Sequence, residues 1–119
     1  MSRNYMSRND ELRRGDSLVS NNGRWKAIFQ DDGNFVIYDD GKATWASDTN
    51  GSDGFRLCLQ GDCNLVLYSQ NGGVVWTTDT YTSETNMCHL QLTDDGKLEL
   101  SREANQLWSS AKNRGWKGY

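Results

Sequence analysis

Hydrophobic and polar residues alternate along several short stretches of this chain, a pattern typical of β-strands with one buried face. The stretch "NFVIY" (34–38) places Phe35 and Ile37 on one face of such a strand. The same alternation occurs in "NLVLY" (64–68) and in "KLELS" (97–101). Twelve glycines and the absence of proline add many turns to this picture. The pattern therefore predicts an all-β protein.

The two faces of these three strands differ in which residue types recur in all three stretches. One face is apolar in every stretch, and we assign its residues to the core: Phe35, Ile37, Leu65, Leu67, Leu98 and Leu100. The other face carries valine and tyrosine in the first two stretches but Glu99 and Ser101 in the third. A purely structural need for valine and tyrosine would apply to all three strands. We therefore interpret the outer face as a site that is present twice and lost once.

The alternating stretches belong to an internal repeat. Trp45, Trp76 and Trp108 are 31 and 32 residues apart, and each follows a hairpin-like unit. The Asp-Gly pairs at 32–33 and 95–96 favour tight turns within these hairpins. The pattern predicts one domain over residues 1–119 with three repeats of three strands, at about 24–49, 54–80 and 88–112. Three such units packed around a threefold axis could share one core.

Charge and hydropathy exclude several classes of protein. A net charge of −3 with interspersed signs argues against nucleic-acid binding, which needs a basic patch. No stretch is long and apolar enough to cross a bilayer, so membrane insertion is not expected. The polar start "MSRNYMSRNDELRRGD" lacks the apolar segment of a secretory signal. The chain is expected to stay inside the cell, to leave by another route, or to be supplied in mature form.

Five side-chain types recur at one spacing in "QDDGNFVIY" (30–38) and "QGDCNLVLY" (60–68). Aspartate accepts strong hydrogen bonds, while asparagine, glutamine and tyrosine both donate and accept them. Valine offers a small apolar surface for the C–H face of a sugar ring. None of these groups is a good nucleophile or a proton shuttle near neutral pH. The set predicts reversible recognition of a neutral polyol.

An enzyme or a metal site is not expected. The neighbouring carboxylates at 31–32, 39–40 and 94–95 would point to opposite faces of a strand, so none forms an acid/base pair across a cleft. His89 is the only histidine, which excludes a metal cluster built on histidines. We therefore expect no catalytic residue, metal or cofactor.

The motif Gln-x-Asp-x-Asn-x-Val-x-Tyr, in repeats each followed by tryptophan, resembles that of the bulb-type mannose-binding lectins (snowdrop agglutinin type). The resemblance covers nearly the whole chain. "NNGRWKAIFQDDGNFVIY" and the tail look most like the pufflectin-like members of fish skin mucus. The resemblance implies a β-prism II fold, with three four-stranded antiparallel sheets and pseudo-threefold symmetry. It also implies one shallow, calcium-independent mannose pocket per sheet, a defence role against microbes or parasites, and an extracellular location.

In that family, Asp and Asn contact the axial 2-hydroxyl of mannose, Gln the 3-hydroxyl and Tyr the 4-hydroxyl, with Val under the ring. The resemblance implies a first pocket of Gln30, Asp32, Asn34, Val36 and Tyr38, and a second of Gln60, Asp62, Asn64, Val66 and Tyr68. The matching third positions are Thr93, Asp95, Lys97, Glu99 and Ser101. Lys97 would replace a two-way amide with a charged amine, and Glu99 would remove the apolar floor. We predict that the third pocket does not bind mannose.

The chain has three cysteines, an odd number. They could form one disulfide and leave one free thiol, or all three could be reduced in a cytosolic protein. The resemblance implies a Cys63–Cys88 disulfide. Cys58 would then be free, on the face of Gln60, and either partly exposed and reactive or buried.

Two further segments leave alternatives open. The resemblance implies a homodimer that exchanges C-terminal strands, and Trp116 and Tyr119 could dock on a partner or within the chain. The tripeptide at 14–16, Arg-Gly-Asp, is read by integrins, but a turn between two N-terminal strands also explains it. A rival to the lectin function is a protein-interaction or storage member of the same fold.

Overall fold

A computed structural model describes residues 3–83 and 87–112 and places twelve short β-strands in these ranges. The prediction of an all-β protein is confirmed. The strands are β1 (Tyr5–Ser7), β2 (Glu11–Arg13), β3 (Ser17–Val19), β4 (Trp25–Phe29), β5 (Phe35–Asp39), β6 (Lys42–Ala46), β7 (Gly54–Leu59), β8 (Leu65–Ser69), β9 (Val74–Thr77), β10 (Cys88–Leu92), β11 (Leu98–Arg102) and β12 (Asn105–Ser109).

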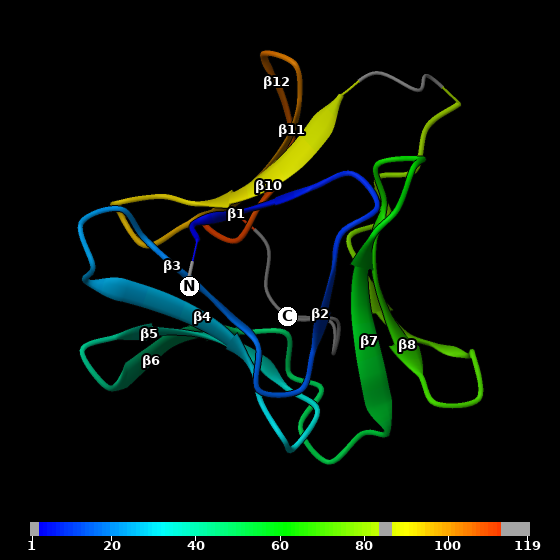
Figure 1. Ribbon diagram of the computed structural model, residues 1–119, viewed down its shortest axis with the longest axis horizontal. Helices are drawn as coiled ribbons and strands as arrows, with labels where there is room; N and C mark the ends of the chain where they lie inside the picture. The colour runs from blue at the N-terminus through cyan, green and yellow to red at the C-terminus, as the bar shows by residue number, and fades with distance from the viewer. Residues whose placement is uncertain (1–2, 84–86, 113–119) are drawn as a thin grey trace.

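The strands form three four-stranded sheets, in the orders β3-β4-β5-β6, β2-β7-β8-β9 and β1-β10-β11-β12. All pairs within the sheets are antiparallel. Figure 1 shows the sheets as three walls around a common axis. Each wall takes three strands from one repeat and its fourth strand from the N-terminal segment 5–19. The predicted arrangement of three four-stranded sheets is confirmed.

The core lies between the walls. All six residues predicted for it are fully buried. Trp45, Trp76 and Trp108 meet edge to face near the axis, with ring centroids 6.1, 5.6 and 5.9 Å apart. Three almost equal separations mark the pseudo-threefold axis and explain why each repeat carries one tryptophan. Such aromatic pairs add about 0.5–1.5 kcal/mol each beyond the area that they bury.

Each hairpin turn between the first two strands of a repeat has a residue with a left-handed backbone at the same place. These residues are Gly33, Cys63 and Gly96, with φ of 87, 70 and 81°. Cys63 forms the predicted disulfide with Cys88 at the start of the third repeat. A Cβ at Gly96 would come within 2.4 Å of the Trp25 ring, so this turn packs directly on the first repeat. The turns therefore tie neighbouring walls together.

The Arg-Gly-Asp tripeptide at 14–16 forms the turn between β2 and β3, as the structural alternative predicted. The Arg14 guanidinium donates to the carbonyl oxygens of Asp31, Ser52 and Gly54 at 2.6, 3.0 and 2.8 Å. These contacts join the first hairpin turn to the start of the second repeat. Arg14 thus has a role in holding the walls together.

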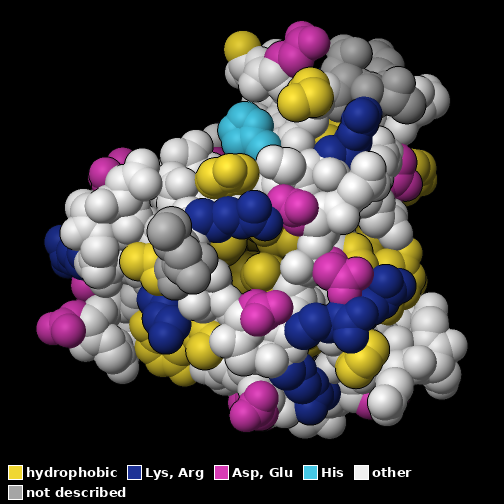
Figure 2. All heavy atoms as spheres, in the orientation of Figure 1, with side chains coloured by type: hydrophobic (Ala, Val, Ile, Leu, Met, Phe, Trp, Pro, Cys, Tyr) yellow, Lys and Arg dark blue, Asp and Glu magenta, His cyan; other side chains and the backbone are white. Residues whose placement is uncertain are grey.

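Surface charge is mixed on the face that Figure 2 shows, where Lys and Arg side chains lie beside Asp and Glu side chains. Within residues 3–83 and 87–112, the structure has no helix that could span a membrane. Trp116 and Tyr119, for which we left open a contact with a partner or within the chain, lie outside the described residues.

Candidate functional site

The first set of recurring residues gathers around the turn between β4 and β5. A tight turn closes through the backbone bond from Gln30 N–H to Asn34 O at 2.8 Å. The Asp32 carboxylate accepts the Asn34 N–H at 3.0 Å and the Gln30 side-chain amide at 3.1 Å. The Tyr38 hydroxyl in turn donates to the Gln30 side chain. Tyrosine, glutamine and aspartate therefore form one hydrogen-bonded chain along the outer face of the sheet.

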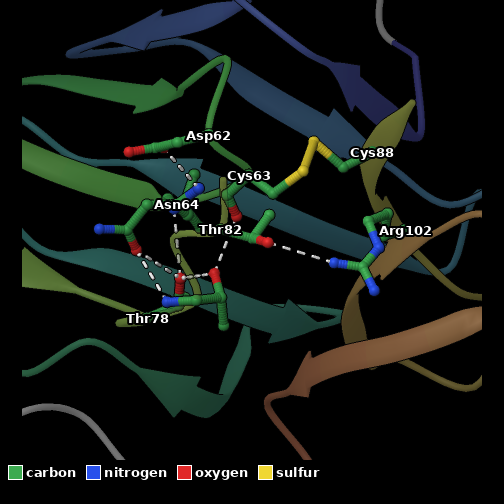
Figure 3. Close-up of a disulfide and its surroundings, with 9 residues drawn as sticks. Asp62, Cys63, Asn64, Thr78, Thr82, Cys88 and Arg102 are labelled. Carbon is green, nitrogen blue, oxygen red and sulfur yellow. Dashed lines mark hydrogen bonds between the residues drawn. A yellow bond between two sulfur atoms is a disulfide. The ribbon is translucent and has the colours of Figure 1, made fainter. Parts of the chain in front are cut away.

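The second set lies at the equivalent place between β7 and β8, but its glutamine donates to the tyrosine instead of to the aspartate. The Asp62 carboxylate accepts the Asn64 N–H at 3.0 Å, and the Gln60 side-chain amide donates to the Tyr68 hydroxyl. Figure 3 shows the Asp62 carboxylate and the Asn64 amide nitrogen projecting to the same side, away from the disulfide. A charged acceptor and a donor thus point to the same side of this turn.

The side-chain oxygen of the asparagine in each set accepts hydrogen bonds from residues that follow the tryptophan of the repeat. Asn34 Oδ1 accepts the Thr49 backbone N–H and the Ser47 hydroxyl, both at 3.1 Å. Asn64 Oδ1 likewise accepts the Thr80 backbone N–H at 3.1 Å and the Thr77 hydroxyl at 2.8 Å. A backbone N–H can only donate, so the amide oxygen must point inward. The NH₂ group is then the part of each asparagine that can serve a ligand.

Sequence reasoning missed this amide cradle, although its signal is present. The segments after the tryptophans read Ser-Asp-Thr at 47–49 and Thr-Asp-Thr at 78–80, but Ser-Ala-Lys at 110–112. The pattern is kept twice and lost once, like the outer-face residues. Thr49 and Thr80 also donate their hydroxyls to the carbonyls of Gly33 and Cys63, at 2.7 and 2.8 Å, which fixes the turn itself.

The valine of each set lies on the outward side of its strand but is nearly covered. Val36 and Val66 are 3% and 2% exposed. In the sheet register Val36 lies between Ile28 and Ala46, and Val66 lies between Cys58 and Thr77. These neighbours explain the burial.

The third set keeps the hydrogen bonds of the fold but not those of the cradle. The Leu98 N–H donates to the Ser110 hydroxyl at 2.9 Å, as the Phe35 N–H does to Ser47 at 3.1 Å. Lys97 stands where the other sets have asparagine, and it carries no acceptor for an inward N–H. Asp95 and Lys97 are both exposed. Thr93, Glu99 and Ser101 complete this set on β11 and the turn before it.

A shallow hollow adjoins each of the first two sets. The hollow at the first set has a volume of about 390 Å³ and includes Gln30 and Tyr38. The hollow at the second has a volume of about 470 Å³ and includes Gln60, Asp62 and Tyr68. A handful of hydrogen-bonding groups in a shallow hollow suits a small, hydroxyl-rich ligand.

The remaining candidates are a thiol and a metal site. Cys58 is free and partly exposed in the second hollow, and burial raises the pKa of its thiol. A raised pKa keeps the thiol protonated at neutral pH and therefore a poor nucleophile. Among the described residues, no group of three or more His, Cys, Asp or Glu side chains is arranged to hold a metal ion.

Comparison with known proteins gives a consistent set of relatives. No family model matches the chain. The B-type lectin plumieribetin of Scorpaena plumieri is 59% identical over 114 residues, which cover 96% of this chain and 100% of that protein. A mannose-specific lectin of Aloe arborescens is 31% identical over 93 residues, covering 77% of this chain and 84% of that one.

Solved structures resemble the chain over most of its length. The monomeric monocot mannose-binding lectins of Gastrodia elata superpose with a TM-score of 0.82 at 32% identity, over 92% of this chain and 96% of that chain. The Polygonatum cyrtonema lectin, solved with a monomannoside, gives 0.75 at 34% identity, over 92% and 97%. The snowdrop agglutinin, solved with methyl-α-D-mannoside, gives 0.74 at 27% identity, over 94% and 99%.

Proposed function

The chain belongs to the B-type (bulb-type) lectins and has their β-prism II fold, and from this premise we propose that it binds mannose reversibly. We place the binding in two weak, metal-independent pockets, one on the β3-β4-β5-β6 sheet and one on the β2-β7-β8-β9 sheet. The third sheet does not bind. The ligands are exposed mannose-rich glycans.

The observation that carries this proposal is the repeated pairing of an aspartate with an inward-held asparagine. A sugar hydroxyl can donate to the carboxylate and accept from the amide NH₂ at the same time. Asp32 with Asn34, and Asp62 with Asn64, offer this pair on the outer face of their sheets. Lys97 removes the amide from the third sheet. Two of the three sheets are therefore equipped for a hydroxyl that is both donor and acceptor.

Affinity for a single sugar should be low. Each hydrogen bond is exchanged against water and contributes about 0.5–1.5 kcal/mol net. A shallow pocket of this kind should bind one mannose on the order of millimolar, roughly −4 kcal/mol. Two pockets on one chain raise avidity toward branched glycans by roughly 10²–10⁴-fold where both can engage. A homodimer, which we propose on the family resemblance alone, would double the number of pockets, and light scattering measures its mass directly.

The proposal is tested by removing both carboxylates. Asp32→Ala combined with Asp62→Ala should abolish retention on a mannose column, because each pocket loses its charged acceptor. Asp95→Ala, at the matching position of the third sheet, should leave retention unchanged. Both results should be the same with a chelator present. Undiminished binding in the double variant would contradict the placement of the pockets, and failure of the unaltered protein to bind would favour the protein-interaction or storage function.

We also propose an extracellular site of action, in recognition of microbes or parasites that display mannose. The Cys63–Cys88 disulfide supports this, because structural disulfides persist in oxidising compartments. Binding without turnover is part of the proposal, since the recurring residues lack a nucleophile. Agglutination of mannan-coated cells, inhibited by free mannose and without release of sugar, is the expected behaviour.

A further inference from the structure

Both hollows are lined by the glutamine and the tyrosine of their set, only the second is also lined by the aspartate, and their remaining lining residues differ. Beyond Gln60, Asp62 and Tyr68, the second hollow is lined by Arg56 of β7, by Glu11 of β2, and by Asn9 and Asp10 in the turn before β2. Beyond Gln30 and Tyr38, the first hollow continues along β4, past Lys26 and Ile28, and the N-terminal strands do not line it.

The sheet register shows which residues near the two hollows occupy equivalent positions. Glu11 pairs with Cys58, which pairs with Val66. In the first sheet Ser17 pairs with Ile28, which pairs with Val36. Glu11 and Ser17 therefore occupy the same place relative to their pockets, and a carboxylate stands in one wall where a short hydroxyl stands in the other.

Two further pairs of positions can be matched between the sheets. Arg56 and Lys26 are the cross-strand partners of Tyr68 and Tyr38. Asn9 and Gly15 both have a left-handed backbone. The Asn9 N–H donates to Leu59 O at the end of β7 at 2.6 Å, and the Gly15 N–H donates to Phe29 O at the end of β4 at 2.7 Å. The first sheet thus has no side chain where the second has an amide.

Contacts among the charged side chains that line the second hollow fix their positions. Glu11 accepts a hydrogen bond from the Arg13 guanidinium and lies 3.4 Å from the Arg56 guanidinium. The Arg56 guanidinium carbon also lies 5.6 Å from the centre of the Tyr68 ring. The hydrogen bond from Arg13 lowers the pKa of Glu11, so the carboxylate is ionised at neutral pH. A carboxylate acceptor and a guanidinium donor therefore stand side by side next to the tyrosine of the pocket.

We propose that the second site is a two-sugar site. It holds one mannose against Asp62, Asn64 and Tyr68 and the adjoining sugar against Glu11, Arg56 and Asn9. Its preferred ligand is a neutral oligomannoside, because this lining offers both acceptors and donors to hydroxyl groups. Its carboxylates, on Asp10 and Glu11, are already paired with the guanidinium groups of Arg3 and Arg13. The first site holds a single sugar. This inference rests on the proposed function.

The two sites can be measured one at a time. Asp32→Ala leaves the second site and Asp62→Ala leaves the first. Titration calorimetry with methyl α-mannoside and with α-linked mannobioses then gives an affinity ratio for each site. At the second site the best mannobiose should bind about tenfold more tightly than the monosaccharide, since tenfold corresponds to the contribution of one or two hydrogen bonds. At the first site the ratio should stay near one.

Glu11→Ser gives the second site the residue that stands at the equivalent place of the first site. In the Asp32→Ala protein, this change should bring the ratio of mannobiose to monosaccharide affinity down toward one. Ser17→Glu in the same protein is the matched control, which adds a carboxylate to the other sheet and should leave the ratio unchanged. Equal ratios at both sites, a ratio unaffected by Glu11→Ser, or an equal loss of affinity for both ligands would overturn the inference. Absence of methyl α-mannoside binding in both single-site proteins would instead contradict the proposed function.

Discussion

Asn34 and Asn64 each turn an amide oxygen toward a backbone N–H, of Thr49 and Thr80, and so present an NH₂ group beside an aspartate. The residue at the third position, Lys97, carries only donors. Lys97 is one of four positions, with Thr93, Glu99 and Ser101, at which the third sheet departs from the two faces that we propose to bind a hydroxyl, while the backbone beneath remains alike.

Asn64→Asp tests this at the level of a single group. The new carboxylate still accepts the Thr80 N–H, so the free energy of unfolding should change little. It has no NH₂ to donate and adds a second negative charge beside Asp62, so affinity at the second site should fall about tenfold or more. Chemical-shift titration with methyl α-mannoside follows both sheets at once, and an unchanged first site is the internal control. Retained binding at the second site would show that the amide donor is not needed.

At the scale of elements, the hairpin turns carry the binding residues and also fix the walls to one another. Cys63 has a φ of 70°, where the other two turns have glycine. This backbone region is unfavourable for a residue with a Cβ. The disulfide to Cys88 holds the turn, and Asp62 and Asn64 flank the cysteine. Stability and the second pocket are therefore linked through one bond.

Cys88→Ser should lower the free energy of unfolding by about 3–4 kcal/mol, because the closed loop has a sequence separation of 25. It should also weaken methyl α-mannoside binding at the second site more than at the first. Adding Cys63→Gly should recover about 0.5–1 kcal/mol, since glycine suits the left-handed turn. Urea unfolding and single-site titration provide the two measurements. Equal weakening of both sites would show that the turn is not coupled to its own pocket.

Elements differ in how far the sequence predicts them. The second strand of each hairpin and its core residues could be predicted because alternation over five residues has a clear period of two. The strands β1 to β3 have three residues each, too few for that pattern. The sequence signal of the amide cradle is easily missed, because Ser47 and Thr49 look like ordinary turn residues until the fold brings them to Asn34, 13 and 15 residues away.

At the scale of the whole molecule, three sheets share one tryptophan-centred core but carry different residues on their outer faces. Each sheet keeps its buried residues because the loss of one wall would expose the other two. The outer faces are free to diverge, since their side chains, Val36 and Val66 included, are not part of the hydrophobic core between the walls. On the two proposals above, the prism has three independent faces: a one-sugar site, a two-sugar site and a face without binding.

The crystal structure of the protein soaked with methyl α-mannoside tests this account most directly. We predict one sugar beside Asp32 and Asn34, one beside Asp62 and Asn64, and none on the third sheet. A sugar bound against Lys97 and Glu99, with the other two pockets empty, would contradict it.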